Sequence, residues 1–504
     1  MRAPEAEDCL SASLLPAADQ SRCDEEGMGV DEMLRRFAGE FGPWQLRQFL
    51  LASIAWALNA LHTMVVIFAD DRESSRPDLC STGFPAGDWA QSTVEEWMLA
   101  CGGESYKIGL AQTAFFAGAM IGAAIFGHLS DSFLGRKGAL TAACALNASF
   151  SLLTAFSPSF PVYVSLRLLT GLSTGGVGLS AFVLATEPVG PSLRASVAMS
   201  TFYFSSLGAI AISLTSLLLP SWRRLYAAAS IPSVVFLLFV IPFISESPRW
   251  HLVRRNLPAA MEVMRSIAKT NGSSIPDNVF LNIDSDKAQD VSASIIHVLR
   301  SPATRPRIFF TILINLLGSV VYYGLTLNVG NLGTDIHFGV ILNAVAEFPA
   351  YAATGIAVRW CGRRRMTAST MAVSGLLCIA GGVLAGKGEM VKAGRLGCAA
   401  MGIFSAAAGF DVLYIYTTEL FPTAVRNAAL GCVTVAGQMG AMTAPMVVAA
   451  GGSSVPFFVF GVCEVVAGTF SWGLPETFNR PLYETMEELE GREGLPEKLS
   501  SPIV

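Results

Sequence analysis

The chain has 504 residues and a formal net charge of −5; 52% of its residues are hydrophobic and only 14% are charged. A soluble domain usually carries about 25% charged residues, so the composition excludes a soluble protein of this size and indicates a membrane protein. The net charge gives no reason to expect a nucleic-acid partner, because in an apolar chain the placement of charge matters more than its sum.

The chain begins with a polar, acidic segment, residues 1–43, that lacks the apolar core of a signal peptide. We therefore expect it to remain as a cytoplasmic tail. A polar stretch at 69–106 follows the first apolar segment and is predicted to be an outer loop. Its cysteines, Cys80 and Cys101, then lie outside the reducing cytosol, where a disulfide can persist. We predict that these two cysteines are bridged.

Apolar stretches long enough to cross a bilayer recur along the rest of the chain. A transmembrane helix needs about 20 mostly apolar residues, and about 12 stretches qualify. In chain order they cover 46–68, 107–129, 139–157, 161–186, 195–219, 225–244, 306–328, 335–359, 366–386, 393–417, 427–450 and 455–473. We predict an all-α membrane protein with six-helix bundles at 44–244 and 306–474, a cytoplasmic central loop at 245–305 and a cytoplasmic tail at 475–504.

Basic residues favour one orientation of these helices. With the N-terminus inside, the loops between even and odd helices face the cytoplasm, and these loops are rich in Lys and Arg, as the positive-inside rule requires. The basic residues concerned are Arg136, Lys137, Arg194, Arg359, Arg363, Arg364, Arg365 and Arg426. The opposite loops are poorer in positive charge, although Arg223, Arg224 and Arg395 lie there.

Three short charged motifs occur twice, in the same order and about 230 residues apart. Each pair follows equivalent helices of the two predicted bundles. The pairs are Gly135-Arg136-Lys137 with Gly362-Arg363-Arg364, Glu187 and Arg194 with Glu419 and Arg426, and Glu246-Ser-Pro-Arg249 with Pro475-Glu476-Thr477. This register indicates a duplicated bundle, an arrangement in which two halves rock around a site near the membrane midplane.

Several of these segments resemble a known family. Gly127-His-Leu-Ser-Asp131-Ser-Phe-Leu-Gly135-Arg136-Lys137 resembles the loop motif of the major facilitator superfamily, in the longer form of the plant organic cation/carnitine transporters. The same group is matched by Ser92–Cys101, Glu246–Trp250, Tyr322-Tyr323-Gly324, Glu347-Phe-Pro349 and Glu419–Asn427. The likeness runs from Trp44 to Thr477.

The resemblance implies a secondary-active or facilitative transporter of organic cations or carnitine-like zwitterions that works by alternating access, and not an enzyme. We further expect a monomer without a cofactor, in the plasma or vacuolar membrane, that binds a small organic solute, either with a coupled proton or sodium ion or by facilitated flux without one. A sugar porter is the alternative, because Glu246-Ser-Pro-Arg249 resembles a motif found there too. Against it, residues 306–328 lack the paired glutamines typical of sugar binders. A channel or membrane enzyme is a more distant alternative, since neither a pore-lining stripe nor clustered nucleophiles are apparent.

Candidate gating residues follow from the resemblance and from the repeat. By resemblance, Asp131, Gly135, Arg136 and Lys137 form a conformational latch. The repeat places Glu187, Arg194, Glu419 and Arg426 at cytoplasmic helix ends, where a Glu–Arg network across the two halves would break on inward opening. The alternative is that these charges only fix topology or reach to water at the interface.

Ionisable groups inside apolar helices are costly there and therefore point to function. Four stand out, Arg167, Glu347, Asp411 and Glu464, and the substrate-binding candidates among them are Arg167, Glu347 and Asp411. Asp411 stands beside Phe410 and near Tyr414, so it could hold an ammonium group by charge and cation–π contact, or a proton. Glu347 precedes Pro349, which frees a backbone carbonyl and suggests a kinked, cavity-facing segment. A purely structural role, hydrogen-bonded to a neighbouring helix, is the alternative for both acids.

Two further observations bear on the substrate. Aromatic residues of several helices could build a cage, although lipid-facing or bundle packing is the favoured alternative for any single one: Tyr322, Tyr323, Phe115, Phe116, Phe202 and Tyr203. Gln438 stands where the animal members of the resembled group carry an Asp. The resemblance therefore implies that cation selectivity rests on Asp411 or Glu347, or that the substrate is zwitterionic or neutral. No Cys/His spacing indicates a metal site.

Overall fold

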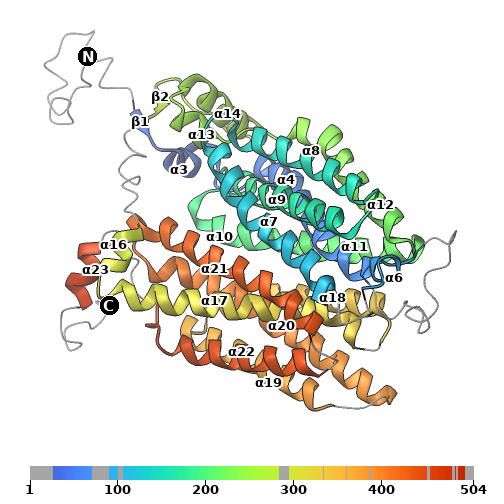
Figure 1. The fold of residues 1–504 in the computed structure, drawn as a ribbon. Helices are drawn as coiled ribbons and strands as arrows, with labels where there is room; N and C mark the ends of the chain where they lie inside the picture. Colours follow the sequence, from blue (N-terminus) through green and yellow to red (C-terminus); the bar gives the residue numbers. More distant parts are fainter. Residues whose placement is uncertain are drawn as a thin grey trace, which may run out of the picture.

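The computed structural model describes residues 26–70, 90–99, 101, 106–282, 295–332, 334–358, 360–384, 388–450, 454–478, 483 and 486–493. In this part of the chain, ten helices are long and apolar enough to cross a membrane. Two more, α8 (Gly135–Thr154) and α22 (Val455–Ser471), complete two bundles of six. The predicted all-helical membrane fold with two bundles is confirmed (Figure 1).

The two bundles follow one another along the chain. The N-terminal half contains α4 (Pro43–Ala69), α7 (Tyr106–Asp131), α8, α9 (Phe160–Thr186), α10 (Pro191–Ser200) with α11 (Phe202–Leu218), and α12 (Trp222–Val235) with η3 (Phe236–Val240) and η4 (Ile241–Phe243). The C-terminal half contains α17 (Thr304–Leu327) with η5 (Asn328–Asn331), α18 (Ile336–Ala357), α19 (Arg363–Val383), α20 (Glu389–Leu420), α21 (Thr423–Ala450) and α22. The segment predicted as one helix at 195–219 is divided at Thr201 into α10 and α11.

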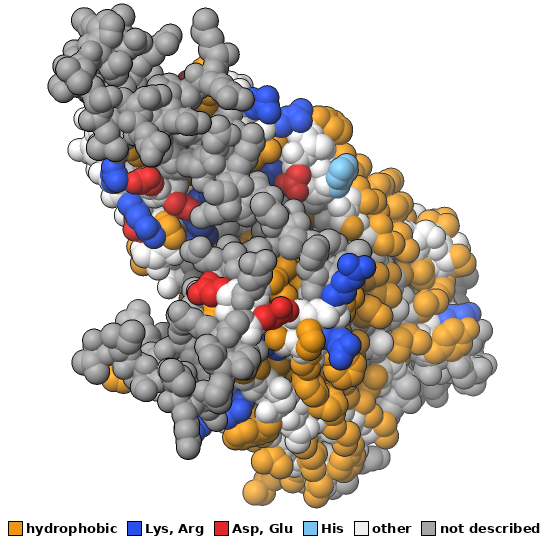
Figure 2. Space-filling model, turned by 90° about the vertical axis from the view of Figure 1, so that its left-hand side faces the viewer, with side chains coloured by type: hydrophobic (Ala, Val, Ile, Leu, Met, Phe, Trp, Pro, Cys, Tyr) orange, Lys and Arg blue, Asp and Glu red, His pale blue; other side chains and the backbone are white. Residues whose placement is uncertain are grey.

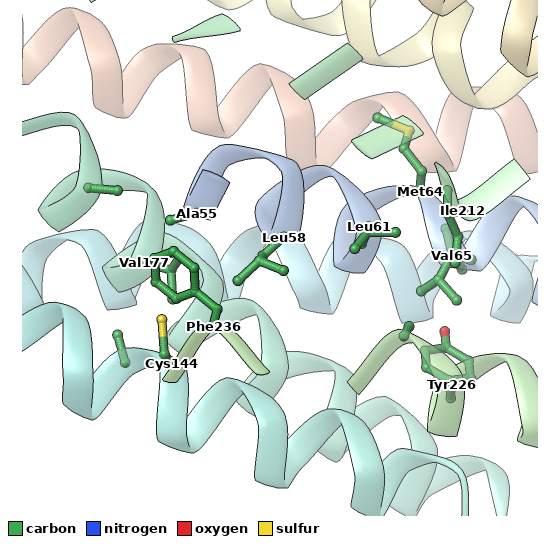
Figure 3. Close-up of a cluster of buried hydrophobic side chains, with 14 of the residues drawn as sticks. Ala55, Leu58, Leu61, Met64, Val65, Cys144, Val177, Ile212, Tyr226 and Phe236 are labelled. Carbon is green, nitrogen blue, oxygen red and sulfur yellow. The ribbon is translucent and has the colours of Figure 1, made fainter. Parts of the chain in front are cut away.

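Small residues set how closely the helices pack. Gly122 of α7 and Gly171 of α9 lie where a Cβ atom would collide with the backbone of the other helix, at Leu172 and Phe115 respectively. This close approach fixes α9 against α7. Apolar side chains then fill the rest of the N-terminal half: Leu58 and Leu61 of α4 pack with Cys144 of α8 and Phe236 of η3 (Figure 3).

The two halves meet along two helix pairs, α7 with α21 and α11 with α18. Thr113 Oγ1 of α7 donates to the Met442 carbonyl at 2.9 Å, and Ser213 Oγ of α11 donates to the His337 carbonyl at 3.2 Å. The His337 ring also stacks on Phe68 of α4, with 5.2 Å between ring centroids. These contacts lie at the end of the bundle away from β1 (Glu26–Met28) and α23 (Met486–Glu493). We refer to that end as the outer end, following the predicted orientation.

The cytoplasmic end carries a small folded module that the sequence did not predict. Strand β1 pairs in parallel with β2 (Val279–Leu281), so a segment before the first membrane helix joins the central segment. Around them lie α3 (Val30–Met33), η2 (Leu34–Ala38), α13 (Pro248–Val253) and α14 (Leu257–Thr270). Met33, Leu34, Met264 and Ile267 are fully buried between these elements. Charged side chains gather on this end, whereas hydrophobic side chains dominate the adjoining flank (Figure 2).

Candidate functional site

Glu347 lies at the seam between the two halves. Its carboxylate accepts hydrogen bonds from Tyr322 Oη at 2.7 Å, from Tyr351 Oη at 3.4 Å and from Ser206 Oγ. Ser206 belongs to α11 of the N-terminal half, whereas both tyrosines belong to the C-terminal half. The side chain is buried, and hydroxyl groups are the partners that the structure records for it. Glu347 therefore links the halves while its negative charge has no described basic partner.

Asp411 is the second acid at this seam. It lies on α20, is 4% exposed, and interacts electrostatically with Glu347, Tyr203 and Tyr351. No Lys or Arg of the described chain neutralises it. A buried carboxylate without a counter-charge is costly, and two that share one site repel each other. The site therefore favours a bound cation or a proton.

Aromatic rings from both halves contact one another in a network that reaches the two acids through Tyr322, Tyr351 and Tyr203, and we call this group the aromatic cage. Its members are Trp56, Phe202, Tyr203, Tyr322, Phe348, Tyr351 and Phe410. Ring centroids lie 5.2 Å apart for Trp56 and Phe202, 5.3 Å for Tyr203 and Tyr351, and 5.5 Å for Tyr322 and Phe410. Aromatic faces attract cations, and more strongly when water is excluded.

Two predicted aromatic residues stand at the edge of this cage. Tyr323 packs on Phe116 of α7, with 4.8 Å between centroids. Tyr414 packs on Phe182 of α9, with 6.4 Å between centroids. Both contacts cross between the halves. Ser206 and Tyr351 were not singled out from the sequence. Tyr351 follows Glu347 by one helical turn, and that spacing was a signal that could have found it.

Arg167 does not join the two acids. It is fully buried on α9, and its guanidinium donates to the His62 carbonyl at 3.0 Å and to Gln112 Oε1. The same group lies over the Phe115 ring, 4.3 Å from the centroid. The positive charge of Arg167 is thus stabilised by neutral groups of the N-terminal half: a carbonyl, a side-chain amide and an aromatic ring. Gln438 is half-buried on α21, and the described contacts give its side chain no hydrogen bond.

The predicted latch residues of the N-terminal half form one network. The Arg136 guanidinium pairs with Glu187 at 3.2 Å and with Asp131 at 3.0 Å, and it donates to the Ser130 carbonyl. The Lys137 ammonium reaches the Pro242 carbonyl at 3.4 Å. The backbone amides of Arg136 and Lys137 both donate to the Glu246 carboxylate, at 3.1 Å each. A carboxylate at a helix N-terminus is stabilising, which explains why α8 begins at Gly135, before the predicted start at 139.

Gly135 adopts a backbone conformation that other residues avoid, with φ +76°, and a Cβ there would collide with the Glu246 carboxylate. We expect Gly135→Ala to lower the free energy of unfolding by roughly 2 kcal/mol, because it adds left-handed strain and displaces Glu246. Thermal unfolding of the purified protein in detergent measures this change.

Gly138→Ala is the matched control for that substitution. Gly138 lies on the same helix, and its nearest neighbour would be 3.4 Å from a new Cβ, which is ordinary contact. There the change should be neutral or stabilising by about 0.5 kcal/mol. Equal unfolding temperatures for the two variants would contradict the role assigned to Gly135.

The C-terminal half repeats the same network with equivalent residues. The Arg363 amide donates to Glu476 at 2.8 Å, and its guanidinium pairs with Glu419 at 3.0 Å. Thr477 Oγ1 also donates to Glu419, at 2.6 Å. Arg363 thus corresponds to Arg136, as the repeat predicts.

The partners within these networks differ from the expected Glu–Arg network across the two halves. Glu187 and Glu419 each bond an arginine of their own half, Arg136 and Arg363, and the described ion pairs of these acids do not cross between the halves. Arg194 and Arg426 interact with Glu187 and Glu419 electrostatically, without a described hydrogen bond to them. Arg194 instead pairs with Asp31 at 2.6 Å. The Nε and NH2 groups of Arg426 have no hydrogen-bond partner among the described residues. The reason is the packing of neighbouring helices. The first turn of α8 lies beside the end of α9, and that of α19 beside the end of α20, so Arg136 and Arg363 lie within bonding distance of Glu187 and Glu419.

A small pocket, with a volume of about 80 Å³, opens at the outer end of the seam, away from the two acids. Its polar lining comes from Asp70, Gln112 and Asn331, none of which the sequence singled out. Asp70 accepts from Tyr163 Oη at 3.3 Å, and Gln112 is bonded to Arg167, so both are already engaged within the N-terminal half. Cys101 is disulfide-bonded. Its predicted partner, Cys80, lies outside the described residues.

Comparison with solved structures identifies the fold. The inward-open xylose transporter XylE of E. coli matches with a TM-score of 0.65 at 18% identity, covering 89% of this chain and 99% of that one. The family described as "Sugar (and other) transporter" matches residues 49–489. The protein is therefore a multi-pass membrane transporter with the major facilitator fold, and not an enzyme.

Comparison with curated sequences narrows this class. Organic cation/carnitine transporter 4 of Arabidopsis thaliana is 50% identical over 482 residues, covering 92% of this chain and 91% of the relative. Organic cation/carnitine transporter 3 of the same plant is 32% identical, covering 92% and 93% respectively. The chain belongs to the organic cation/carnitine transporter family.

Proposed function

We propose that this protein carries organic cations across the membrane by alternating access, with Glu347 and Asp411 as the counter-charges of the substrate. The observation that supports this most is the pairing of two buried, unneutralised carboxylates within the aromatic cage at the seam of the halves. The names of the 50% and 32% identical relatives support the same substrate class.

The chemistry of the cage favours a permanent cation over a neutral solute. A quaternary ammonium group has no hydrogen to donate, so it is recognised by charge and by aromatic faces, and the cage offers both. A hexose needs many directed hydrogen bonds, whereas the tyrosine hydroxyls of Tyr322 and Tyr351 are already bonded to Glu347. The two terminal nitrogens of Arg167 donate to the His62 carbonyl and to Gln112, so this guanidinium is held inside the N-terminal half and does not join the two acids.

The two acids also suggest a coupled proton. Without substrate, two buried carboxylates in one site repel each other, and one bound proton relieves this repulsion. A substrate cation would take the place of that proton and release it. We therefore propose exchange of a cation for a proton, with the networks around Arg136 and Arg363 as latches that hold one state of the cycle. The expected plasma or vacuolar membrane location and monomeric state stay predictions.

Uptake by the purified protein in proteoliposomes tests this function. The panel is tetraethylammonium, carnitine and glucose, each with and without a pH gradient. We expect tetraethylammonium uptake that is at least about fivefold faster when the lumen is acidic, because outward proton movement then drives exchange. Equal uptake rates with and without the pH gradient would rule out proton coupling. If glucose is taken up and tetraethylammonium is not, the substrate is a sugar and not an organic cation.

A further inference from the structure

The segment Glu26–Gly42 precedes the first membrane helix and is held in place along its whole length; we call it the clasp. Its β1 strand pairs with β2, and Val30, Met33 and Leu34 are fully buried against the central segment. The side chain of Asn271 fastens its end, donating to the Ala38 carbonyl at 2.8 Å and accepting from the Trp44 amide at 3.2 Å. The clasp is thus an ordered part of the N-terminal half.

Two acids of the clasp reach the start of α10. Asp31 bonds Arg194 at 2.6 Å and Arg249 at 2.5 Å, so one carboxylate joins α10 to α13. Glu40 accepts from the amide and the hydroxyl of Ser192, in the first turn of α10. The Glu40 carbonyl also accepts from the Gly190 amide at 2.9 Å. The bonds made by the Asp31 and Glu40 carboxylates carry charge, which makes them stronger than neutral hydrogen bonds such as the one to Gly190.

The other end of α10 leads directly to the proposed cation site. Helix α10 ends at Ser200, the helical structure is interrupted at Thr201, and α11 begins with Phe202 and Tyr203 of the aromatic cage. Ser206, one turn further on, donates to Glu347 of the other half. A shift of α10 relative to the bundle therefore moves three groups that contact Glu347 or Tyr351.

We propose that the clasp sets the position of α10, and that Asp31 and Glu40 are positioning residues for the cation site. The positioning role of Asp31 and Glu40 rests on the proposed function, whereas the anchoring of α10 by the clasp does not. The duplication sharpens it, because Arg426 occupies the place of Arg194 in the other half and has unbonded Nε and NH2 groups among the described residues. The clasp thus gives Arg194 a second acid, Asp31, in addition to Glu187, whereas Glu419 is the acid that acts on Arg426 among the described residues.

Hydrogen exchange of the full-length protein tests the clasp without any substrate. We expect Asp31→Asn and Glu40→Gln each to raise amide exchange across residues 190–200 by roughly tenfold, since each removes a charged bond to α10. Exchange across α19, in the other half, is the internal reference. Glu32→Gln is the matched control, because the ion pair that Glu32 makes with the described residues is an exposed one with Arg36, at 2.6 Å and on the same stretch of chain.

A double variant distinguishes the effect of unbalanced positive charge at Arg194 and Arg249 from a nonspecific destabilisation of the fold. In Asp31→Asn, Arg194 and Arg249 face each other without their shared carboxylate. Adding Arg249→Gln removes one of the two positive charges, so exchange across 190–200 should return partway to the wild-type rate. If Asp31→Asn and Glu40→Gln exchange like Glu32→Gln, the clasp does not hold α10 and the proposal is overturned.

The second readout is the KM for tetraethylammonium in proteoliposomes. We expect Asp31→Asn and Glu40→Gln to raise this KM about threefold or more, with a smaller change in kcat, because cage groups are misplaced in the empty site. Faster exchange with an unchanged KM would reject the positioning role. If the wild-type protein carries no cation, the proposed function fails, whereas the exchange result still decides whether the clasp holds α10.

Discussion

Asp411→Asn should weaken binding of tetraethylammonium at least about 30-fold, which corresponds to about 2 kcal/mol. The amide keeps the shape of the side chain but removes one of two negative charges in a buried, aromatic site. Loss of one partner of a desolvated charge pair typically costs about 2–5 kcal/mol. The dissociation constant of the purified protein, measured by calorimetry or by competition with a fluorescent cation, gives the effect directly.

The matched control for this substitution is Glu464→Gln. Glu464 is also a buried acid of the C-terminal half, but it lies on α22 beside Ser374 and outside the aromatic cage. Its amide variant should bind the cation within about threefold of wild type. If Asp411→Asn binds as tightly as Glu464→Gln, Asp411 is not the counter-charge. Because Asp411 and Glu347 interact, the Glu347→Gln/Asp411→Asn double variant should show effects that do not simply add.

Arg136→Gln and Arg363→Gln should each lower the maximal transport rate by roughly tenfold or more while leaving cation affinity within about threefold. Each arginine bonds an acid at the cytoplasmic end of its half and has a mostly buried side chain, 14% and 15% exposed. Its loss removes the arginine partner of Glu187 or Glu419, which biases the states of the cycle without touching the cage. Initial uptake rates in proteoliposomes, together with equilibrium binding, separate the two quantities.

Arg365→Gln is the control for both latch substitutions. Arg365 lies in the same turn as Arg363, but its side chain is exposed. It should transport at close to the wild-type rate. Equal rates for Arg365→Gln and Arg363→Gln would show that the C-terminal network is no latch, and a tenfold loss of affinity would place the arginine at the substrate instead.

The membrane fold and its internal repeat could be predicted from the sequence because both depend on local patterns. Apolar stretches of helical length have no other stable place than a bilayer, and the paired motifs at Arg136 and Arg363 occupy equivalent places in the structure. Glu347 and Asp411 stood out for a related reason: an acid inside an apolar helix is costly wherever the helix packs.

The partner of each charge was decided only by the tertiary structure. The sequence predicted a Glu–Arg network across the two halves, whereas folding places Arg136 beside Glu187 and brings Asp31, 163 residues earlier in the chain, to Arg194. Ser206 and Glu347 likewise meet only because α11 packs on α18. A sequence pattern reports which face of a helix is buried. Which side chains then come within bonding distance depends on how helices from distant parts of the chain pack together, and no local pattern encodes that.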